Sequence, residues 1–255
     1  DTEARLSLLG LLNQEIVKEL GGVVASGKES NVYFATRGDA RREDGSLLSE
    51  SPAYALKVFK TIDIFKYRHE YIDGKLLREF VKASKFNPRR CVRLWAQKEL
   101  RNLRKLSKSG IKVPQPIGLF GHCLVMAFIG TNGVPAPTLH DLTNVLHKES
   151  SWRQAYKEVC EAMQKMYQQC KLVHADLSEF NVLRDEDGAC WIIDVAQAVL
   201  SDHRNAMDYL RRDCQTLTNF FRARKIVTLT SIELFQYVTD PELPTEAVEG
   251  LLENA

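Results

Sequence analysis

The segment at residues 172–194, LVHADLSEFNVLRDEDGACWIID, constrains the fold of this chain more than any other. Two short apolar stretches at 182–184 and 190–193 flank the dipeptide Asp187-Gly188, which favours a tight turn. This pattern predicts a β-hairpin. A hairpin brings the residues before its first strand close to those after its second strand, so polar side chains at both ends can converge.

Three polar residues stand at those ends. Asp176, Asn181 and Asp194 follow one another with spacings of five and thirteen positions. The catalytic loop of protein kinases, H-R-D-x-x-x-x-N, and the metal-binding aspartate after it have this layout. There a carboxylate accepts the hydroxyl proton, while an amide oxygen and a second carboxylate hold Mg²⁺ on the phosphates. The alternative is an ordinary polar loop before a core strand, which the aspartate at the end of an apolar strand disfavours.

A lysine-bearing strand and a long helix are predicted in the first half of the chain. Residues 54–60, YALKVFK, predict a strand with Lys57 at its centre, as in the V-A-I-K strand of kinases. Asn87 and Pro88 favour the start of a helix, which extends to Gly110. The apolar stripe of this helix contains Val92, Trp95, Leu103 and Leu106.

Glu99 lies in line with Trp95 and Leu103 on that stripe. A buried carboxylate is costly without a partner, so we expect an ion pair with Lys57, as in the small lobe of a kinase. The alternative places Glu99 at the solvated edge of the stripe, because the helix carries many charges.

A glycine-containing loop precedes the lysine strand. Residues 22–29, GVVASGKE, nearly match the Walker A pattern G-x-x-x-x-G-K-[ST] of P-loop NTPases. The match fails because Glu29 stands where a Ser or Thr must bind Mg²⁺, and a strand, not a helix, is predicted next. The loop also keeps only Gly27 of the central glycines of kinases, so Ser26, Lys28 and Ser30 are candidates for side-chain contacts to phosphate.

These segments together resemble those of the RIO atypical protein kinases, from about residue 21 to residue 241. SGKESNVYFA resembles the phosphate loop of that family, ALKVFKT its lysine strand, and NPRR with WAQKELRNL its glutamate helix. LVMAFIG followed by VPAP resembles its hinge, LVHADLSEFNVL its catalytic loop and IIDVAQAV its metal loop. Gln97 departs from the glutamate usual in the family, and Ala196 and Ala198 stand where serines are common.

The resemblance implies an α+β, bilobal, protein-kinase-like fold. An N-terminal helix at 1–20 is expected to pack on an N-lobe at 21–125, which holds an antiparallel sheet and the glutamate helix. A hinge and a reduced, mostly helical C-lobe at 126–255 are expected to lack the activation segment and the peptide-docking lobe, since no A-P-E motif follows Asp194. Within the C-lobe, helices are predicted at 151–170 and 208–221.

The resemblance also implies the site residues. Asp176, Asp194 and Lys57 are expected to be catalytic, and Asn181 and Asp194 to bind the metal. The expected cofactors are ATP and Mg²⁺, with Mn²⁺ as an alternative ion. Residues expected to bind the nucleotide are Ser26, Gly27, Lys28, Glu29, Ser30, Val32, Lys57, Glu99, Met126, Ala127, Phe128 and Ile129. For Met126, plain core packing is an equal alternative.

Two segments carry further expectations. The charged, serine-bearing insert at 37–51 is predicted to be a hairpin tip and resembles the third branch of the family, whereas other segments resemble the first branch. Residues 61–86 show no clean periodicity and resemble the flexible loop in which RIO kinases autophosphorylate, with Thr61 and Ser84 as candidates. Asp213, near the middle of the 208–221 helix, is a candidate to bind the catalytic loop and position His174, or else lies on a solvated face.

Composition limits the location and the partners of the chain. A hydrophobic share of 44% and a charged share of 27% over 255 residues are ordinary for a globular protein. The net charge of +2 is too small to imply nucleic acid by itself. No apolar stretch is long enough for a membrane span, no signal peptide pattern is present, and the six cysteines form no C-x-x-C pair. We therefore expect a cytoplasmic protein with nuclear shuttling as an option, no membrane partner, and a monomer or weak dimer.

Three functions remain open at this point. The first is ATP-dependent transfer of phosphate to Ser/Thr, with autophosphorylation. The second is an ATPase switch in which Asp194 receives the γ-phosphoryl group; the resemblance to the first branch implies a pre-ribosomal small-subunit particle, protein and rRNA, as the partner. The third is a binding module without turnover, or an adaptor kinase of the third branch. A basic set could meet rRNA, although a solvated helix face explains it better: Arg89, Arg90, Arg93, Arg101, Arg104 and Lys105.

Overall fold

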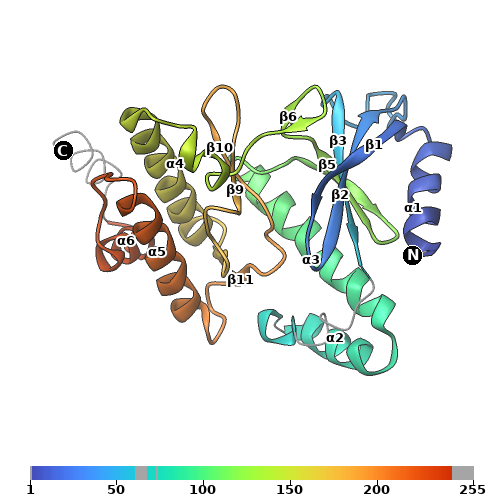
Figure 1. Ribbon diagram of the computed structural model, residues 1–255. Helices are drawn as coiled ribbons and strands as arrows, with labels where there is room; N and C mark the ends of the chain where they lie inside the picture. The colour runs from blue at the N-terminus through green and yellow to red at the C-terminus, as the bar shows by residue number, and fades with distance from the viewer. Residues whose placement is uncertain (1, 61–67, 73, 243–255) are drawn as a thin grey trace. The chain divides into compact units, whose positions relative to one another are not determined.

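The computed structural model describes residues 2–60, 68–72 and 74–242. The chain divides into two compact units (Figure 1). The N-terminal unit contains Asp1–Arg104 and Pro114–Pro135, and the C-terminal unit contains Lys105–Val113 and Ala136–Ala255. The first unit is built around an antiparallel sheet and the second mainly from helices, which confirms the predicted α+β class.

A five-stranded antiparallel sheet, in the order β1-β2-β3-β5-β4, forms the centre of the N-terminal unit. Its strands are β1 (Val17–Ser26), β2 (Ser30–Arg37), β3 (Ala53–Phe59), β4 (Pro116–Phe120) and β5 (Cys123–Ala127). The short pair β6 (Gly130–Thr131) and β7 (Val134–Pro135) follows. Strand β3 is central, and all of its residues except the first are buried. Both faces of β3 are therefore covered.

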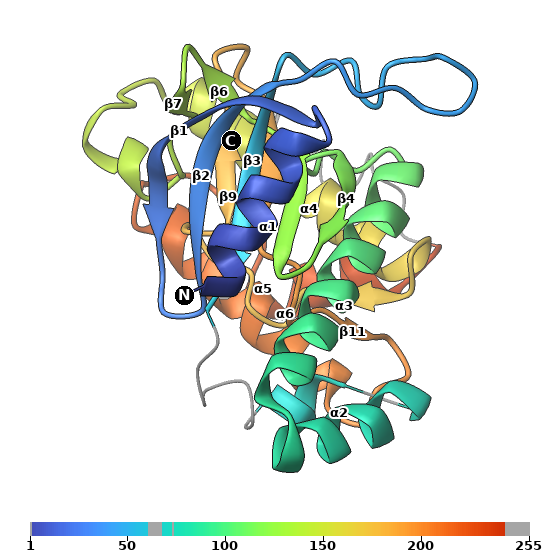
Figure 2. The same ribbon diagram turned by 90° about the vertical axis from the view of Figure 1, so that its right-hand side faces the viewer.

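Helices α1 (Thr2–Asn13) and α3 (Pro88–Lys108) cover opposite faces of this strand. Leu11 of α1 packs in one apolar cluster with Leu56 and Val58 of β3. Because successive side chains of a strand point to opposite faces, Lys57 points away from that cluster and meets α3 through Glu99. Figure 2 views the sheet from the side that α1 covers.

The prediction of a single helix over residues 1–20 is wrong at its C-terminal end. Helix α1 ends at Asn13, and β1 already begins at Val17. Glu15 adopts a left-handed φ of 54°, and the Ile16 N–H donates to the Leu11 carbonyl oxygen at 3.0 Å, which closes the helix. The pairing of β1 with β2 then outweighs the helical spacing of the apolar residues, and Leu6 and Leu9 stay more than half exposed.

The prediction of a flexible loop over residues 61–86 is also wrong in part. Helix α2 (Gly74–Phe86) occupies the second half of that range. Phe80 and Ala83, one turn apart, are buried, and the Phe80 ring lies 6.3 Å from the Trp95 ring of α3. Packing against α3 therefore stabilises a helix whose sequence alone gives only a weak signal. Thr61 and the side chain of Ser84 lie outside the described residues.

The C-terminal unit is built on three helices and two small β-ribbons. The helices are α4 (Glu149–Gln168), α5 (Ala206–Arg222) and α6 (Ser231–Thr239), and a 3-10 turn, η2, spans Asp141–Asn144. β8 (Leu172–Val173) pairs with β11 (Val199–Leu200), and β9 (Val182–Arg184) pairs with β10 (Cys190–Ile192). The predicted hairpin and both predicted helices are thus confirmed.

The buried face of α4 forms the core of this unit. The buried residues of this face include Tyr156, Val159, Met163 and Met166, which recur at helical spacing. The Tyr156 ring lies 5.1 Å from the Phe221 ring of α5, and its hydroxyl accepts a hydrogen bond from the Leu229 N–H at 3.0 Å. The unit therefore carries the catalytic-loop segment on a firmly packed helical base.

Two further observations concern the whole chain. Among the described residues, no helix combines the length and apolar character needed to cross a lipid bilayer. All six cysteines are buried thiols. Burial raises the pKa of the Cys123 thiol to about 12, so it stays protonated and unreactive at neutral pH.

Candidate active site

A buried ion pair joins β3 to α3. Lys57 Nζ lies 2.7 Å from Glu99 Oε1, and the two residues are only 7% and 1% exposed. The expected pair between a strand lysine and a helix glutamate is therefore present. The neighbouring Gln97 is exposed and cannot replace Glu99 at this position.

The cap of α3 fixes where Glu99 falls on the helix. The Asn87 side-chain oxygen accepts a hydrogen bond from the Arg90 N–H at 3.0 Å, as predicted for an N-cap. From this start, Val92, Trp95, Glu99, Leu103 and Leu106 all lie on the buried side of α3. The carboxylate is thus part of the packed face of the helix and is not at its solvated edge.

The turn between β1 and β2 holds the candidate phosphate-binding residues. A strand follows this turn immediately, which excludes the Walker A arrangement, because a P-loop needs a helix there. The Gly27 N–H donates to the Ser30 carbonyl oxygen at 2.9 Å, and Lys60 Nζ donates to the Gly27 carbonyl oxygen at 2.6 Å. The turn is therefore held by one backbone hydrogen bond of its own and by the side chain of Lys60.

The side chains of this turn differ in their access to a ligand. Lys28 is exposed, whereas Ser30 is buried and Glu29 forms an ion pair with Arg68. The Ser26 hydroxyl donates to the Asn31 side-chain oxygen at 2.8 Å. Of the three side chains predicted to contact phosphate, only Lys28 is both exposed and charged. Val32 of β2 stands directly opposite Lys57 of β3.

The segment after β5 holds the expected adenine-binding residues. Met126, at the end of β5, is 9% exposed, and the Phe128 ring packs edge-on against Phe34 with 5.0 Å between ring centres. The Ala127 N–H donates to the Gln115 carbonyl oxygen, and the Phe128 N–H donates to the Ala53 carbonyl oxygen at 3.0 Å. No residue that the structure describes accepts a hydrogen bond from the Ile129 N–H. Among the described residues, this backbone donor thus has no acceptor, as we expect for a donor to an adenine ring.

In the C-terminal unit, the β9–β10 hairpin brings Asn181 and Asp194 together. The Ile193 N–H donates to the Asn181 carbonyl oxygen at 3.0 Å, directly before Asp194. The Asn181 amide donates to the Asp176 carbonyl oxygen at 2.8 Å, so its side-chain oxygen remains for a ligand. Asp194 adopts a left-handed φ of 56°, a conformation common at functional positions. Hydrogen bonds thus join Asp176 to Asn181, and Asn181 to the residue directly before Asp194.

Asp213 of α5 supports the loop that carries Asp176. Its carboxylate is 2% exposed and accepts hydrogen bonds from the Ala175 N–H at 2.9 Å and the Leu177 N–H at 3.0 Å. Burial raises the pKa of Asp213 to about 7, although these two donors act in the opposite direction. The predicted contact of Asp213 with the catalytic loop is therefore present, and in the same loop His174 Nε2 lies 3.1 Å from the Ile193 carbonyl oxygen.

Two residues at this loop were missed by sequence reasoning. The Gln197 side-chain amide donates to Asp176 Oδ2 at 3.1 Å, and the Arg212 guanidinium donates to the Ala175 carbonyl oxygen at 2.6 Å. Gln197 lies three positions after Asp194 and Arg212 directly before Asp213, so proximity to the predicted residues was the only available signal. Ala196 and Ala198 are buried and offer no hydroxyl groups.

The donor set suits a hard cation. An amide oxygen from Asn181 and a carboxylate from Asp194 are the oxygen ligands that Mg²⁺ prefers, with the remaining positions taken by water and phosphate. Within the described part of the chain, no group of three His, Cys, Asp or Glu residues forms a self-sufficient metal site. Asn181 and Asp194 would thus supply only part of the oxygen shell that Mg²⁺ takes.

An antiparallel sheet with a buried lysine–glutamate pair, and a helical unit with an Asp/Asn/Asp hairpin, define a protein-kinase-like fold. Two crystal structures of the Rio2 kinase from Chaetomium thermophilum share this fold. One matches with a TM-score of 0.65 at 22% identity, covering 100% of this chain and 72% of that one. The other, a complex with ADP, Mg²⁺ and phosphoaspartate, matches with a TM-score of 0.62 at 21% identity, covering 98% and 70%.

Sequence comparison identifies the family within that class. The RIO domain model matches residues 31–234, so the chain belongs to the RIO family. It is 40% identical to the human serine/threonine-protein kinase RIO1, covering 100% of this chain and 42% of the relative. It is 38% identical to the mouse serine/threonine-protein kinase RIO3, covering 94% and 46%. The chain thus spans less than half the length of these relatives.

Proposed function

We propose that this chain is an atypical serine/threonine protein kinase of the RIO type that uses Mg²⁺-ATP. The observation that carries the proposal is the buried Lys57–Glu99 pair, because a lysine fixed in this way is suited to hold the phosphates of a nucleotide. Relatives at about 40% identity are named serine/threonine-protein kinases, and the Rio2 complex contains ADP and Mg²⁺.

Each residue has a defined part in this proposal. Lys57 contacts the α- and β-phosphates, and Glu99 holds the lysine side chain in position. Asn181 and Asp194 bind Mg²⁺, which neutralises the phosphate charge when bound. Asp176 accepts the proton of the attacking hydroxyl group, and Gln197 orients its carboxylate. The exposed Lys28 adds positive charge near the phosphates.

Metal-dependent ATP binding tests this assignment. A ligand that binds only the native state raises the melting temperature, by an amount that grows with the logarithm of the ratio of its concentration to its dissociation constant. ATP with Mg²⁺ should therefore raise the melting temperature more than ATP with EDTA. An equal shift with and without metal would show that Asn181 and Asp194 do not share a metal with the nucleotide.

A second candidate function is an ATPase switch. Helix α5 begins only twelve positions after Asp194, which leaves little chain for an activation segment that binds peptide substrates. In this reaction an Asp194 oxygen attacks the γ-phosphorus, the bond to the bridging β–γ oxygen breaks, and ADP leaves. Water then hydrolyses the aspartyl phosphate. The phosphoaspartate in the Rio2 complex supports the proposal.

The chemistry of the trapped phosphate separates the two candidates. After brief incubation with labelled ATP, an aspartyl phosphate would be lost in base, whereas phosphoserine and phosphothreonine survive acid. Label that survives acid and maps to a hydroxyl residue would support autophosphorylation. Label released by neutral hydroxylamine, which cleaves acyl phosphates and leaves phosphate esters intact, would support the switch.

We further propose a cytoplasmic role in maturation of the small ribosomal subunit, with the pre-40S particle as partner. This rests on the resemblance to the first branch of the family. Co-sedimentation of the protein with purified pre-40S particles, with and without a non-hydrolysable ATP analogue, tests it. The alternative, an adaptor kinase of the third branch, predicts no nucleotide-dependent binding to such particles.

A further inference from the structure

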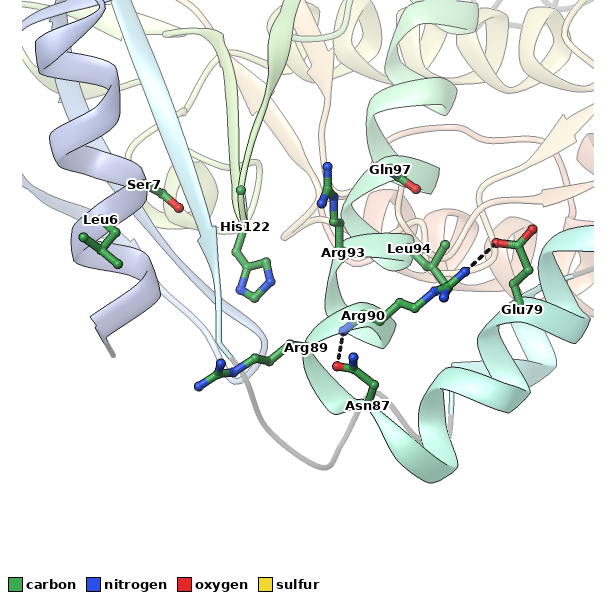
Figure 3. Close-up of a pocket in the computed structure, with 11 residues that line it drawn as sticks. Leu6, Ser7, Glu79, Asn87, Arg89, Arg90, Arg93, Leu94, Gln97 and His122 are labelled. Carbon is green, nitrogen blue, oxygen red and sulfur yellow. Dashed lines mark hydrogen bonds and ion pairs between the residues drawn. The ribbon is translucent and has the colours of Figure 1, made fainter.

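The N-terminal unit contains a cavity of about 790 Å³ that uses none of the candidate active-site residues. Its walls come from α1, α2, the first turns of α3 and the turn between β4 and β5 (Figure 3). This volume lies within the range of small-ligand sites. The cavity is therefore large enough for a specific ligand.

Positive charge predominates among the described residues of the cavity. Arg89, Arg90 and Arg93 line it from α3, and Glu79 of α2 is the one carboxylate. Glu79 is already engaged, because its Oε2 lies 3.6 Å from the Arg90 guanidinium. Arg93 is exposed, and no described residue forms an ion pair or hydrogen bond with its side chain. The positive end of the α3 dipole adds to this charge.

An apolar patch accompanies the arginines. Leu94 forms part of the wall, and Leu6 of α1 stays 61% exposed at the same cavity. Polar hydrogen-bonding groups are also present, since Gln97 and His122 line it. A ligand that fills this space would therefore combine an anion with an apolar group.

The contact between α1 and the β4–β5 turn fixes one wall. Gly121 has a φ of 61°, and a Cβ atom added there would lie only 2.4 Å from Ser7 Oγ. The close approach of the helix to the turn therefore depends on glycine. The wall that carries Leu6 is held directly beside His122.

We propose that this cavity binds a phosphorylated peptide segment, with the phosphate of a phosphoserine or phosphothreonine on Arg93 and an apolar neighbouring side chain on Leu6 and Leu94. Arginine forks pair with phosphate through two parallel hydrogen bonds. Clusters of arginine recognise phosphorylated motifs in this way. An RNA backbone fits less well, because it would bring further phosphates past Glu79 and gain nothing from the leucines.

A ligand in this cavity would contact the same helix that carries Glu99 of the ion pair. Arg93 and Glu99 lie on the same helix, about 9 Å apart along its axis. A ligand that ties the first turns of α3 to α1 and to the β4–β5 turn would stabilise the orientation of α3. This regulatory consequence rests on the proposed function, whereas binding itself does not.

A degenerate peptide library tests the binding. Nine-residue peptides with a central phosphothreonine and random flanks are passed over the immobilised protein, with the matched unphosphorylated library in parallel. A saturating non-hydrolysable ATP analogue with Mg²⁺ keeps the nucleotide site occupied. We expect enrichment of phosphorylated peptides with an apolar residue at a fixed offset. Absence of any enrichment over the unphosphorylated library would overturn the proposal.

Variants of the protein then show where the selected peptide binds. The peptide carries a fluorescent label, and its affinity for each variant is measured by fluorescence anisotropy. Arg93→Gln should weaken its binding by about tenfold or more, with an unchanged melting temperature, and Leu6→Ser should weaken it less. Arg101→Gln is the matched control, an exposed arginine of α3 outside the cavity, and should bind as the wild type does. Equal losses for Arg93→Gln and Arg101→Gln would contradict the site.

Two further experiments distinguish this proposal from a failure of the proposed function and from RNA binding. Asp176→Asn, in the C-terminal unit, should slow ATP turnover strongly but leave peptide capture unchanged, so a failure of the proposed function would not be mistaken for a failure of this proposal. A single-stranded RNA hexamer should not displace the peptide at equal concentration. Displacement by the RNA would mean that the cavity serves nucleic acid instead.

Discussion

Lys57 and Glu99 form a buried ion pair with 2.7 Å between Nζ and Oε1, although 42 positions separate them in the chain. The pair joins the central strand of the sheet to the face of α3 that packs on it. Removing either member leaves the other as a buried charge, and such changes cost about 3 kcal/mol or more. The pair therefore links the stability of the N-terminal unit to the phosphate-binding role that we propose.

A double-mutant cycle tests this link. Lys57→Met and Glu99→Gln should each lower the free energy of unfolding and reduce turnover strongly. The double variant should lose little more turnover than either single variant, because residues that act as a unit are not additive. Fully additive losses in unfolding and in turnover would show that the two side chains do not act together.

Binding measurements distinguish the metal ligand from the base. Asp194→Ala should weaken Mg²⁺-dependent ATP binding in calorimetric titrations, because it removes one of two protein ligands. Asp176→Ala should leave that affinity nearly intact, since a general base contributes to turnover and not to ground-state binding. If Asp176→Ala abolished binding while Asp194→Ala spared it, the two roles would have to be exchanged.

The buried Asp213 predicts a pH dependence of stability. Burial raises the folded-state pKa of Asp213 from 3.8 to about 7. Between these two pH values the folded protein therefore binds more protons than the unfolded chain. As a result, the contribution of Asp213 to the free energy of unfolding falls as pH rises through this range. The Asp213→Asn variant should be less stable than the wild type over this whole pH range, because the one side-chain oxygen of asparagine cannot accept from both backbone N–H groups.

Urea unfolding from pH 5 to pH 8 measures the effect. The stability difference between the wild type and Asp213→Asn should narrow by up to about 1.4 kcal/mol per pH unit and level off above pH 7. Groups common to both proteins cancel in this difference. A difference that widens with rising pH would mean that the two N–H donors outweigh burial.

The close packing around Gly38 predicts that a larger residue at this position destabilises the protein. A Cβ atom at this position would lie 1.9 Å from the Glu15 carbonyl oxygen, at the point where α1 ends. Gly38→Ala should therefore lower the free energy of unfolding by about 1–3 kcal/mol. Gly22→Ala on β1 is the control, because nothing lies within 4 Å of its added Cβ atom. Equal effects in denaturant unfolding would contradict the close packing at Gly38.

The sequence predicted those parts of the molecule in which residue type and spacing encode local geometry. The hairpin follows from two apolar stretches around a turn, and the position of Glu99 follows from a capped helix with a regular apolar stripe. Even the partner of Glu99 could be inferred, because a buried carboxylate needs a cation. In each case a local rule and the tertiary structure agree.

The wrong predictions fall where tertiary packing decides. Residues 17–20 have helical spacing but pair with β2, and α2 is stabilised by Trp95, which is distant in sequence. Gln197 and Arg212 act through hydrogen bonds to the loop of Asp176, and no spacing rule predicts such contacts. The basic residues in the first turns of α3 are exposed, as predicted, but the sequence does not reveal the cavity that α1 and α2 form with them.

The most direct test of the central claim is the fate of the γ-phosphate of ATP. Protein incubated with Mg²⁺ and γ-labelled ATP should transfer label to protein or release it as inorganic phosphate, and Asp176→Asn should slow this by about 10²–10⁴-fold. Asp213→Asn should slow it less, because Asp213 acts only through the loop. Wild-type protein that binds Mg²⁺-ATP but neither transfers nor releases the γ-phosphate, or an Asp176→Asn variant with unchanged turnover, would contradict the account.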